Sequence, residues 1–169
     1  ALAVPPLHAA AEANDPTAVR AALADGSAID ELNDVGTTPL MNAVSRDHLR
    51  AAAALMKMGA DAAIRDESTG MAPLDFAASR GQGKIVKMLL RYERVAASLV
   101  HESDGLTPLH RACLGSEAGH TDAVFALLEH GVPPDQLSRD QRTPLQLAGN
   151  ENTRKLLMEA LQEQRRKGG

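Results

Sequence analysis

Apolar and polar segments alternate along the chain with a nearly constant period. Each cycle starts with Pro-Leu, continues through two short apolar segments separated by a turn, and ends in an extended polar stretch. The Pro-Leu pairs lie 33, 34, 35 and 36 residues apart, and they start at Pro6, Pro39, Pro73, Pro108 and Pro144. A period in this range is typical of a solenoid of stacked helix pairs. We therefore predict an all-α solenoid of five helix-turn-helix units in a single domain over residues 1–164, with units at about 5–36, 37–70, 71–105, 106–141 and 142–164 and a basic, glycine-containing tail at 165–169.

The residues at the predicted helix ends suit those positions. Proline is favourable at the first helical position because it has no N–H group to lose. A preceding threonine can accept a hydrogen bond from a free helix N–H group, and three cycles have one: Thr38, Thr107 and Thr143. Pro5 and Ala72 replace it in the first and third cycles, so we expect those helix starts to be weaker by about 1 kcal/mol each.

Glycines mark the predicted ends of the second helices and the tips of the polar loops. Three second helices are followed by glycine, which adopts a left-handed conformation most readily: Gly26, Gly59 and Gly131. The loop tips predicted from glycine-containing turns are Asp34–Gly36, Glu67–Gly70 and Ser103–Gly105.

The fourth cycle shows the repeating unit most completely. It reads Gly105-Leu-Thr-Pro-Leu-His-Arg-Ala-Cys113 and, after a turn, Asp122-Ala-Val-Phe-Ala-Leu-Leu-Glu-His-Gly131. This pattern resembles the ankyrin repeat, and the resemblance covers about residues 5–163. It implies β-hairpin-like loops between the helix pairs, and a surface that binds other proteins.

Three departures from the pattern change the expected structure. The third cycle lacks the glycine after its second apolar segment, so we predict a longer second helix through Arg91–Ala96. The fourth is lengthened at Gly115–Ala118, which we interpret as a tolerated loop, with a partner contact as the alternative. The resemblance gives the histidine of Pro-Leu-His a role in tying the turn together; it is present at His8 and His110 and replaced by Met41, Asp75 and Gln146.

Composition narrows the possible partners. Hydrophobic residues make up 44% of the chain but include only two Phe, one Tyr and no Trp, which argues for close helix packing and against a sheet. The formal net charge is −4, so the chain has no strong cationic field for phosphates. Few aromatic rings are available to stack on bases. We expect no nucleic acid partner.

The chain also lacks signs of a membrane or disulfide-bonded protein. No apolar run approaches the length of a membrane-spanning helix, so we expect no membrane insertion. Cys113 is the single cysteine, which excludes an internal disulfide. We expect a monomer in isolation and a cytoplasmic location, with a processed or exported form left open.

We expect no catalytic residue, no cofactor and no metal. A metal site needs ligands clustered at short spacing, whereas His8 and His110 occupy the same structural position in distant units. Cys113 takes the place of a packing alanine and is interpreted as a core side chain. Hydrolase, zinc-protease and phosphate-loop motifs are missing from the sequence. The chain is therefore predicted to be non-enzymatic.

The candidate functional residues lie where successive units place equivalent side chains about 10 Å apart. The ends of the first helices contribute Ser45, Arg46, Ser79 and Arg80. The repeated Ser-Arg predicts two neighbouring guanidinium groups that can bind carboxylates bidentately; solvated or ion-paired arginines are the alternative. The loop tips contribute Asp34, Val35, Thr37, Ser68, Met71, Ser103, Asp104, Leu106, Arg139, Asp140 and Arg142.

Three of these tip residues are apolar where solvent favours polar groups: Val35, Met71 and Leu106. An apolar line surrounded by charge is typical of a partner surface; packing between neighbouring loops is the alternative. We therefore expect a protein-binding adaptor or scaffold that takes a protein or peptide in a concave groove of loop tips and first helices. A structural subunit of a larger complex, and a targeting or regulatory domain of a longer enzyme or channel, remain as alternatives.

Overall fold

The chain forms a stack of helix pairs. The computed structural model describes residues 4–92, 101 and 104–168, and within these residues it contains ten helices and no strand. The first helices of the pairs are α1 (Pro6–Glu12), α3 (Pro39–Ser45), α5 (Pro73–Ser79), α7 (Pro108–Leu114) and α9 (Pro144–Leu147). The second helices are α2 (Pro16–Ala24), α4 (Leu49–Lys57), α6 (Gly83–Leu89), α8 (Ala118–Glu129) and α10 (Glu151–Gly168). The predicted all-α solenoid is confirmed.

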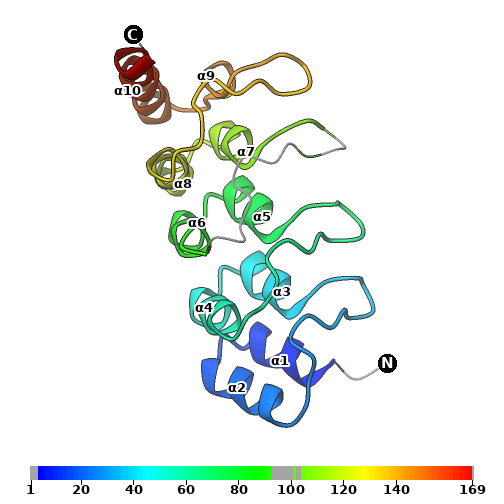
Figure 1. The fold of residues 1–169 in the computed structure, drawn as a ribbon. Helices are drawn as coiled ribbons and strands as arrows, with labels where there is room; N and C mark the ends of the chain where they lie inside the picture. Colours follow the sequence, from blue (N-terminus) through cyan, green and yellow to red (C-terminus); the bar gives the residue numbers. More distant parts are fainter. Residues whose placement is uncertain (1–3, 93–100, 102–103, 169) are drawn as a thin grey trace.

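The two kinds of helix form two columns. The first helices lie in one column and the second helices in the other, with α2 at one end of the stack and α10 at the other (Figure 1). The long loops project beyond the column of first helices, on the side away from the second helices (Figure 1). Equivalent loops therefore lie one above another along the stack.

Threonine caps three of the first helices, as predicted. The hydroxyl groups of Thr38, Thr107 and Thr143 accept hydrogen bonds from the backbone N–H groups three residues later. Ala72 cannot do this, but the Asp75 carboxylate accepts a hydrogen bond from the Ala72 N–H at 3.1 Å. Half of a capping box is thus retained in the third unit.

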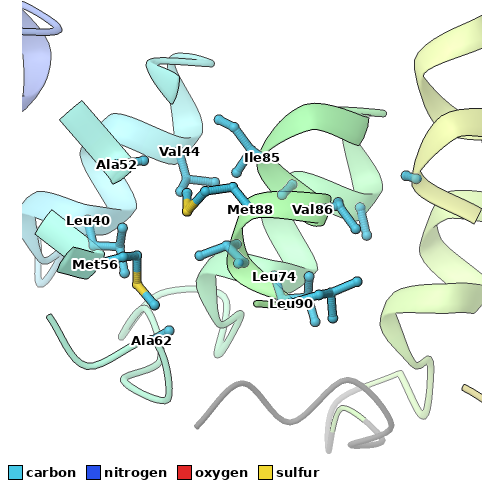
Figure 2. Packing of buried hydrophobic residues seen from close by; sticks show 14 of the residues in the cluster. Leu40, Val44, Ala52, Met56, Ala62, Leu74, Ile85, Val86, Met88 and Leu90 are labelled. Atoms are coloured by element: carbon cyan, nitrogen blue, oxygen red, sulfur yellow. The ribbon is translucent and has the colours of Figure 1, made fainter. Parts of the chain in front are cut away.

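The core runs through the stack between the two columns. The leucine after each proline is fully or almost fully buried in four units: Leu7, Leu40, Leu74 and Leu109. Figure 2 shows side chains from α3, α4, α5 and α6 filling the space between the second and third units, including Val44 and Met88. Since each unit buries its apolar side chains against its neighbours, the units stabilise one another.

Hydrogen bonds from each turn to the preceding first helix fix the stacking register. His48 Nδ1 lies 3.1 Å from the Ala11 carbonyl oxygen, and Gln82 Nε2 donates to the Val44 carbonyl at 2.8 Å. His120 Nε2 lies 3.1 Å from the Ser79 carbonyl oxygen. In the last unit the donor is a backbone group instead of a side chain: the Gly149 N–H donates to the Cys113 carbonyl at 2.8 Å. These contacts satisfy carbonyl groups that a helix end leaves free.

The third unit differs from the sequence prediction. α6 ends at Leu89 rather than continuing through residues 91–96, of which 93–96 lie outside the described residues. The N–H groups of Arg91 and Tyr92 bond to the Met88 and Leu89 carbonyls, and these tight turns close the helix. Leu90, in this turn, remains buried.

The fourth and fifth units also show their special features. Residues 115–117 form a loop between α7 and α8, and Ala118 is the first residue of α8. The lengthened turn is therefore divided between a loop and the start of a 12-residue helix. At the carboxyl end, residues 165–168 of the expected tail continue α10.

Candidate partner-binding surface

Each long loop is closed by a backbone hydrogen bond across its base. The donors and acceptors are Asn33 and Thr37 at 3.1 Å, Asp66 and Met71 at 2.9 Å, His101 and Leu106 at 2.8 Å, and Ser138 and Arg142 at 2.9 Å. The glycines at three tips have positive φ: Gly36 at 75°, Gly70 at 69° and Gly105 at 66°. The loops are therefore hairpin-like turns of defined shape, which can hold side chains in fixed positions.

Short polar side chains stabilise the inside of each tip. Asn33 Oδ1 accepts hydrogen bonds from the N–H groups of Val35 and Thr37. Asp66 Oδ1 accepts from the hydroxyl and N–H groups of both Ser68 and Thr69. Burial opposes ionisation of Asp66, but these hydrogen bonds outweigh it, so the pKa of Asp66 is lowered. The tip side chains that bond inward are thus partly structural.

Two buried histidines join first helices to the backbone of the next unit. His8 Nε2 lies 2.9 Å from the Thr37 carbonyl oxygen of the second unit. His110 Nε2 lies 3.1 Å from the Arg142 carbonyl oxygen of the fifth unit. Both rings are fully buried, and burial lowers the pKa of His110. His110 also ties its own turn together, as the resemblance implied, because its Nδ1 accepts from the Thr107 N–H at 3.3 Å. The Nδ1 atom of His8 has no such hydrogen bond among the described residues.

An ionic cluster occupies the equivalent place between the third and fourth units. Asp75 stands where His8 and His110 stand in their units, and its Oδ1 lies 3.5 Å from Arg111 Nε. Arg111 Nη2 also donates to both carboxylate oxygens of Asp104, at 3.0 and 2.8 Å. Arg65 Nη1 lies 3.9 Å from Asp75 Oδ2, and His101 Nδ1 lies 3.4 Å from Asp104 Oδ1.

The pKa values of the two carboxylates of this cluster shift in opposite directions. The side chains of Arg111 and Asp75 are only 5% and 6% exposed. Burial raises the pKa of Asp75, despite the hydrogen bond from Ala72 and the charge of Arg111. Burial also acts to raise the pKa of Asp104, but the hydrogen bond from Leu106 and the interactions with Arg111 outweigh it, so the pKa of Asp104 is lowered. Asp104 is therefore the stronger partner of the guanidinium group.

The predicted tip residues divide into exposed and packed ones. Val35 is 68% exposed. Met71 and Leu106 are half-buried, and Leu106 packs against the core, which agrees with the alternative interpretation at that position. Thr37 is half-buried, and its hydroxyl oxygen lies 3.0 Å from Asn33 Oδ1 and 2.9 Å from Asn42 Oδ1, so it can donate to either. The exposed tip residues are Asp34, Ser68, Asp104, Arg139, Asp140 and Arg142, and Ser103 lies outside the described residues.

The two predicted arginines are exposed and already have contacts within the chain. Arg46 Nη2 donates to Glu12 Oε1 at 3.1 Å, and the Arg46 side chain is 53% exposed. Arg80 Nη1 donates to the Ser45 carbonyl at 3.0 Å, so Arg80 lies at the end of α3. Ser45 and Ser79 each donate back to a carbonyl of their own helix. Both guanidinium groups retain donors that face solvent.

Sequence reasoning missed one exposed apolar residue at the end of a first helix. Leu114 is 54% exposed and occupies in α7 the position that Ser45 and Ser79 occupy in α3 and α5. The signal was available in the sequence, since leucine replaces serine at an equivalent position. We use "inner surface" for the loop tips together with Arg46, Arg80 and Leu114.

These environments predict how the stability of the chain depends on pH. Below pH 6.5 the unfolded chain protonates His110 more readily than the folded chain, so stability decreases from pH 6.5 towards the lowered pKa of His110. The stabilisation from Asp66 and Asp104 is present above pH 3.8 and is lost as the pH falls through their lowered pKa values. The raised pKa of Asp75 has the opposite sign, since protonation of Asp75 favours the folded chain.

The first of these steps can be isolated with His110→Gln. The chain itself has glutamine at the equivalent position, where Gln146 Oε1 accepts from the Thr143 N–H at 2.9 Å. Thermal melting followed by circular dichroism, from neutral pH to below pH 3.8, should show a smaller loss near pH 6.5 in the variant and an unchanged loss at lower pH. Identical slopes near pH 6.5 in both proteins would show that His110 does not contribute.

Comparison with known families agrees with the repeating structure. The family model "Ankyrin repeats (3 copies)" matches residues 7–98 and 92–167. The chain belongs to the ankyrin repeat family. Repeats of this family generally mediate protein–protein interactions and are generally non-enzymatic modules.

Several curated relatives contain similar segments. Inversin of Gallus gallus is 32% identical over 136 residues, which is 80% of this chain and 12% of that protein. Inversin of Homo sapiens is 38% identical over 105 residues, covering 62% of this chain and 10% of that protein. The ankyrin repeat and KH domain-containing protein mask-1 of Caenorhabditis elegans is 33% identical over 139 residues, 79% of this chain and 5% of that protein. The chain thus spans about a tenth or less of the length of these relatives.

No helix in the described part of the chain is both long and apolar enough to cross a membrane. Among residues 4–92, 101 and 104–168, no three His, Cys, Asp or Glu side chains gather as ligands for a metal ion. Cys113 is fully buried, and burial raises the pKa of its thiol to about 12, which suits a packing role.

Proposed function

We propose that this ankyrin repeat chain is a non-enzymatic adaptor that binds a protein or peptide across its inner surface. The observation that carries the proposal is the common direction of the loops, which project on one side of the first helices (Figure 1). This arrangement presents exposed apolar groups, Val35 and Leu114, together with the exposed guanidinium groups of Arg46 and Arg80. Exposed apolar groups among charges are typical of a docking surface.

The fixed geometry of this surface supports binding without rearrangement. Backbone hydrogen bonds close the loops, and the inter-unit hydrogen bonds hold each helix end against the next unit. A partner therefore meets side chains that are already ordered, which reduces the entropy lost on association. The partner's carboxylates would pair with Arg46 and Arg80, and its apolar side chains would cover Val35 and Leu114.

Neutral substitution of the two arginines tests the proposal. We expect Arg46→Gln with Arg80→Gln to weaken binding of proteins captured from a cell extract by about tenfold or more, because charged anchors of this kind carry much of an interface's binding energy. The melting temperature should change little, since both side chains are exposed. Affinity capture with quantitative mass spectrometry compares the proteins retained by the two chains.

A matched control removes two cations elsewhere. Arg50→Gln with Lys57→Gln makes the same change in net charge on α4, where both residues are exposed. Partners lost from the Arg46 and Arg80 variant should remain bound to this control. Equal retention on all three proteins would reject the inner surface as the binding site, and a large drop in melting temperature would show that the arginines are structural.

The role as part of a longer protein is a second candidate. The relatives support it, because this chain corresponds to 12% of Gallus gallus Inversin and to 27% of a Danio rerio protein named as a putative palmitoyltransferase. In that case the inner surface would position a larger protein rather than link two others. The sequence of the complete reading frame distinguishes these candidates.

A further inference from the structure

A groove lies between α6 and α8, in the column of second helices and apart from the inner surface. Its volume is about 410 Å³. Leu90, Phe125 and Ala126 provide its apolar lining. Phe125 is 49% exposed, although an aromatic ring of this size would gain from burial. The groove therefore offers an apolar contact that no described residue completes.

One wall of the groove carries a row of cations. Lys84, Lys87 and Arg91 line it from α6 and the turn that follows, and all three are exposed. Lys84 and Lys87 share one face of α6 because they are three residues apart, and Arg91 follows in the turn. None of them forms an ion pair with a carboxylate in the described part of the chain. This wall therefore presents three positive charges that no carboxylate of the described residues neutralises.

The opposite wall carries the opposite charge. Asp122 and Glu129 line the groove from α8, three residues before and four residues after Phe125. The groove thus has a cationic side and an acidic side with an apolar middle. A uniformly charged polyanion would be repelled by α8, whereas a peptide can direct its carboxylates to α6 alone.

We propose that this groove binds an acidic peptide segment with an apolar anchor. The anchor side chain packs on Phe125 and Leu90. The carboxylates of the segment run along α6, opposite Lys84, Lys87 and Arg91. This second docking site lies outside the inner surface, and it would let one chain hold two partners at once.

Selection from a random peptide display library against the whole chain tests the proposal. Enriched peptides that depend on Phe125 should carry Asp or Glu beside an aromatic or aliphatic residue. Their affinities, measured by fluorescence anisotropy, should fall by about tenfold or more in Phe125→Ala and in Lys84→Glu with Lys87→Glu and Arg91→Glu, since buried aromatic and cationic anchors dominate such contacts. Affinity should decrease as salt increases.

Two further variants test the direction of the charge effect and control for the change in net charge. Asp122→Lys with Glu129→Lys should preserve or tighten binding of the same peptides, because it removes the repelling wall. Arg20→Glu with Arg50→Glu and Lys57→Glu makes the same charge change as the α6 variant on the exposed surface of α2 and α4, and should leave affinity nearly unchanged. Thermal melts of every variant establish that each remains folded.

Several outcomes would overturn the proposal. Enriched peptides without acidic residues, or acidic peptides that bind the α6 variant as well as the parent, would reject it. Equal losses of peptide affinity in the α6 variant and the charge control would mean that the peptides respond only to the overall charge of the chain. Binding of phosphatidylserine vesicles lost in the α6 variant, or a dimer in analytical ultracentrifugation that the same variant dissociates, would assign the groove to a membrane surface or to a second copy. The proposed function is tested separately by Arg46→Gln with Arg80→Gln, which changes only the inner surface. Rejection of the groove proposal would therefore not reject the proposed function.

Discussion

Replacement of Arg111 by leucine should lower the free energy of unfolding at neutral pH by about 3–5 kcal/mol, the usual effect of removing one partner of a buried ion pair. Arg111 is 5% exposed and contacts Asp75 and Asp104 at once. Without it, the Asp75 carboxylate, 6% exposed, would keep its hydrogen bond from Ala72 but, among the described ion pairs, only Arg65 at 3.9 Å. Denaturant unfolding followed by circular dichroism measures the change.

The raised pKa of Asp75 makes this loss dependent on pH. Because burial already disfavours its ionised form, loss of Arg111 should raise the pKa of Asp75 further. Protonation then removes the unpaired charge, so the difference between variant and parent should shrink as the solution is made mildly acidic. A penalty that is constant with pH would show that lost packing of the arginine side chain dominates.

Two further variants separate charge from packing. Asp75→Asn added to Arg111→Leu removes the unpaired charge and keeps an acceptor for the Ala72 N–H, so it should recover most of the loss. Arg46→Leu serves as the matched control, because Arg46 also pairs with a carboxylate, Glu12 at 3.1 Å, but is 53% exposed. Its effect should be below about 1 kcal/mol. Equal effects of Arg46→Leu and Arg111→Leu would contradict the burial argument.

The repeat period was enough to predict the fold, because it reflects a packing constraint. Each Pro-Leu pair places a proline at the first position of a helix and directs the following leucine towards the core. Both placements can be predicted from the residue types alone. The capping threonines and the glycines with positive φ have similarly local causes. Features that depend on one or two neighbouring residues could therefore be predicted.

Features that depend on contacts between units could not be predicted. In the sequence, Asp75 is only a replacement of the histidine found in the first and fourth units. The fold brings Arg111 next to Asp75, and Asp104 next to Arg111. The end of α6 at Leu89 has no glycine to mark it, and composition does not reveal that Leu90 is buried beyond it. Composition counts Phe125 without showing its environment, and only the fold places it at the groove with 49% of its surface exposed.

The closeness of α6 and α8 leads to an expected loss of stability where helix propensity alone predicts a gain. Gly119 lies in the first turn of α8, and alanine there would favour the helix by up to about 1 kcal/mol. A Cβ atom on Gly119 would lie 2.1 Å from the Gly81 carbonyl oxygen. That neighbour is backbone, so α8 must move away from the turn before α6 to make room.

Gly119→Ala should therefore lower the free energy of unfolding by about 1–3 kcal/mol, the range for overpacking, despite its better helix propensity. The displacement would also disturb the contact of His120 Nε2 with the Ser79 carbonyl, at 3.1 Å, which helps to join the third and fourth units. Gly168→Ala in α10 is the control, because a Cβ atom there meets nothing within 4 Å. Denaturant unfolding should place the control within about 0.5 kcal/mol of the parent, as is usual for surface substitutions. A Gly119→Ala protein as stable as the parent would show that the two backbone segments do not approach this closely, and the register of the stack between the third and fourth units would need to be redrawn.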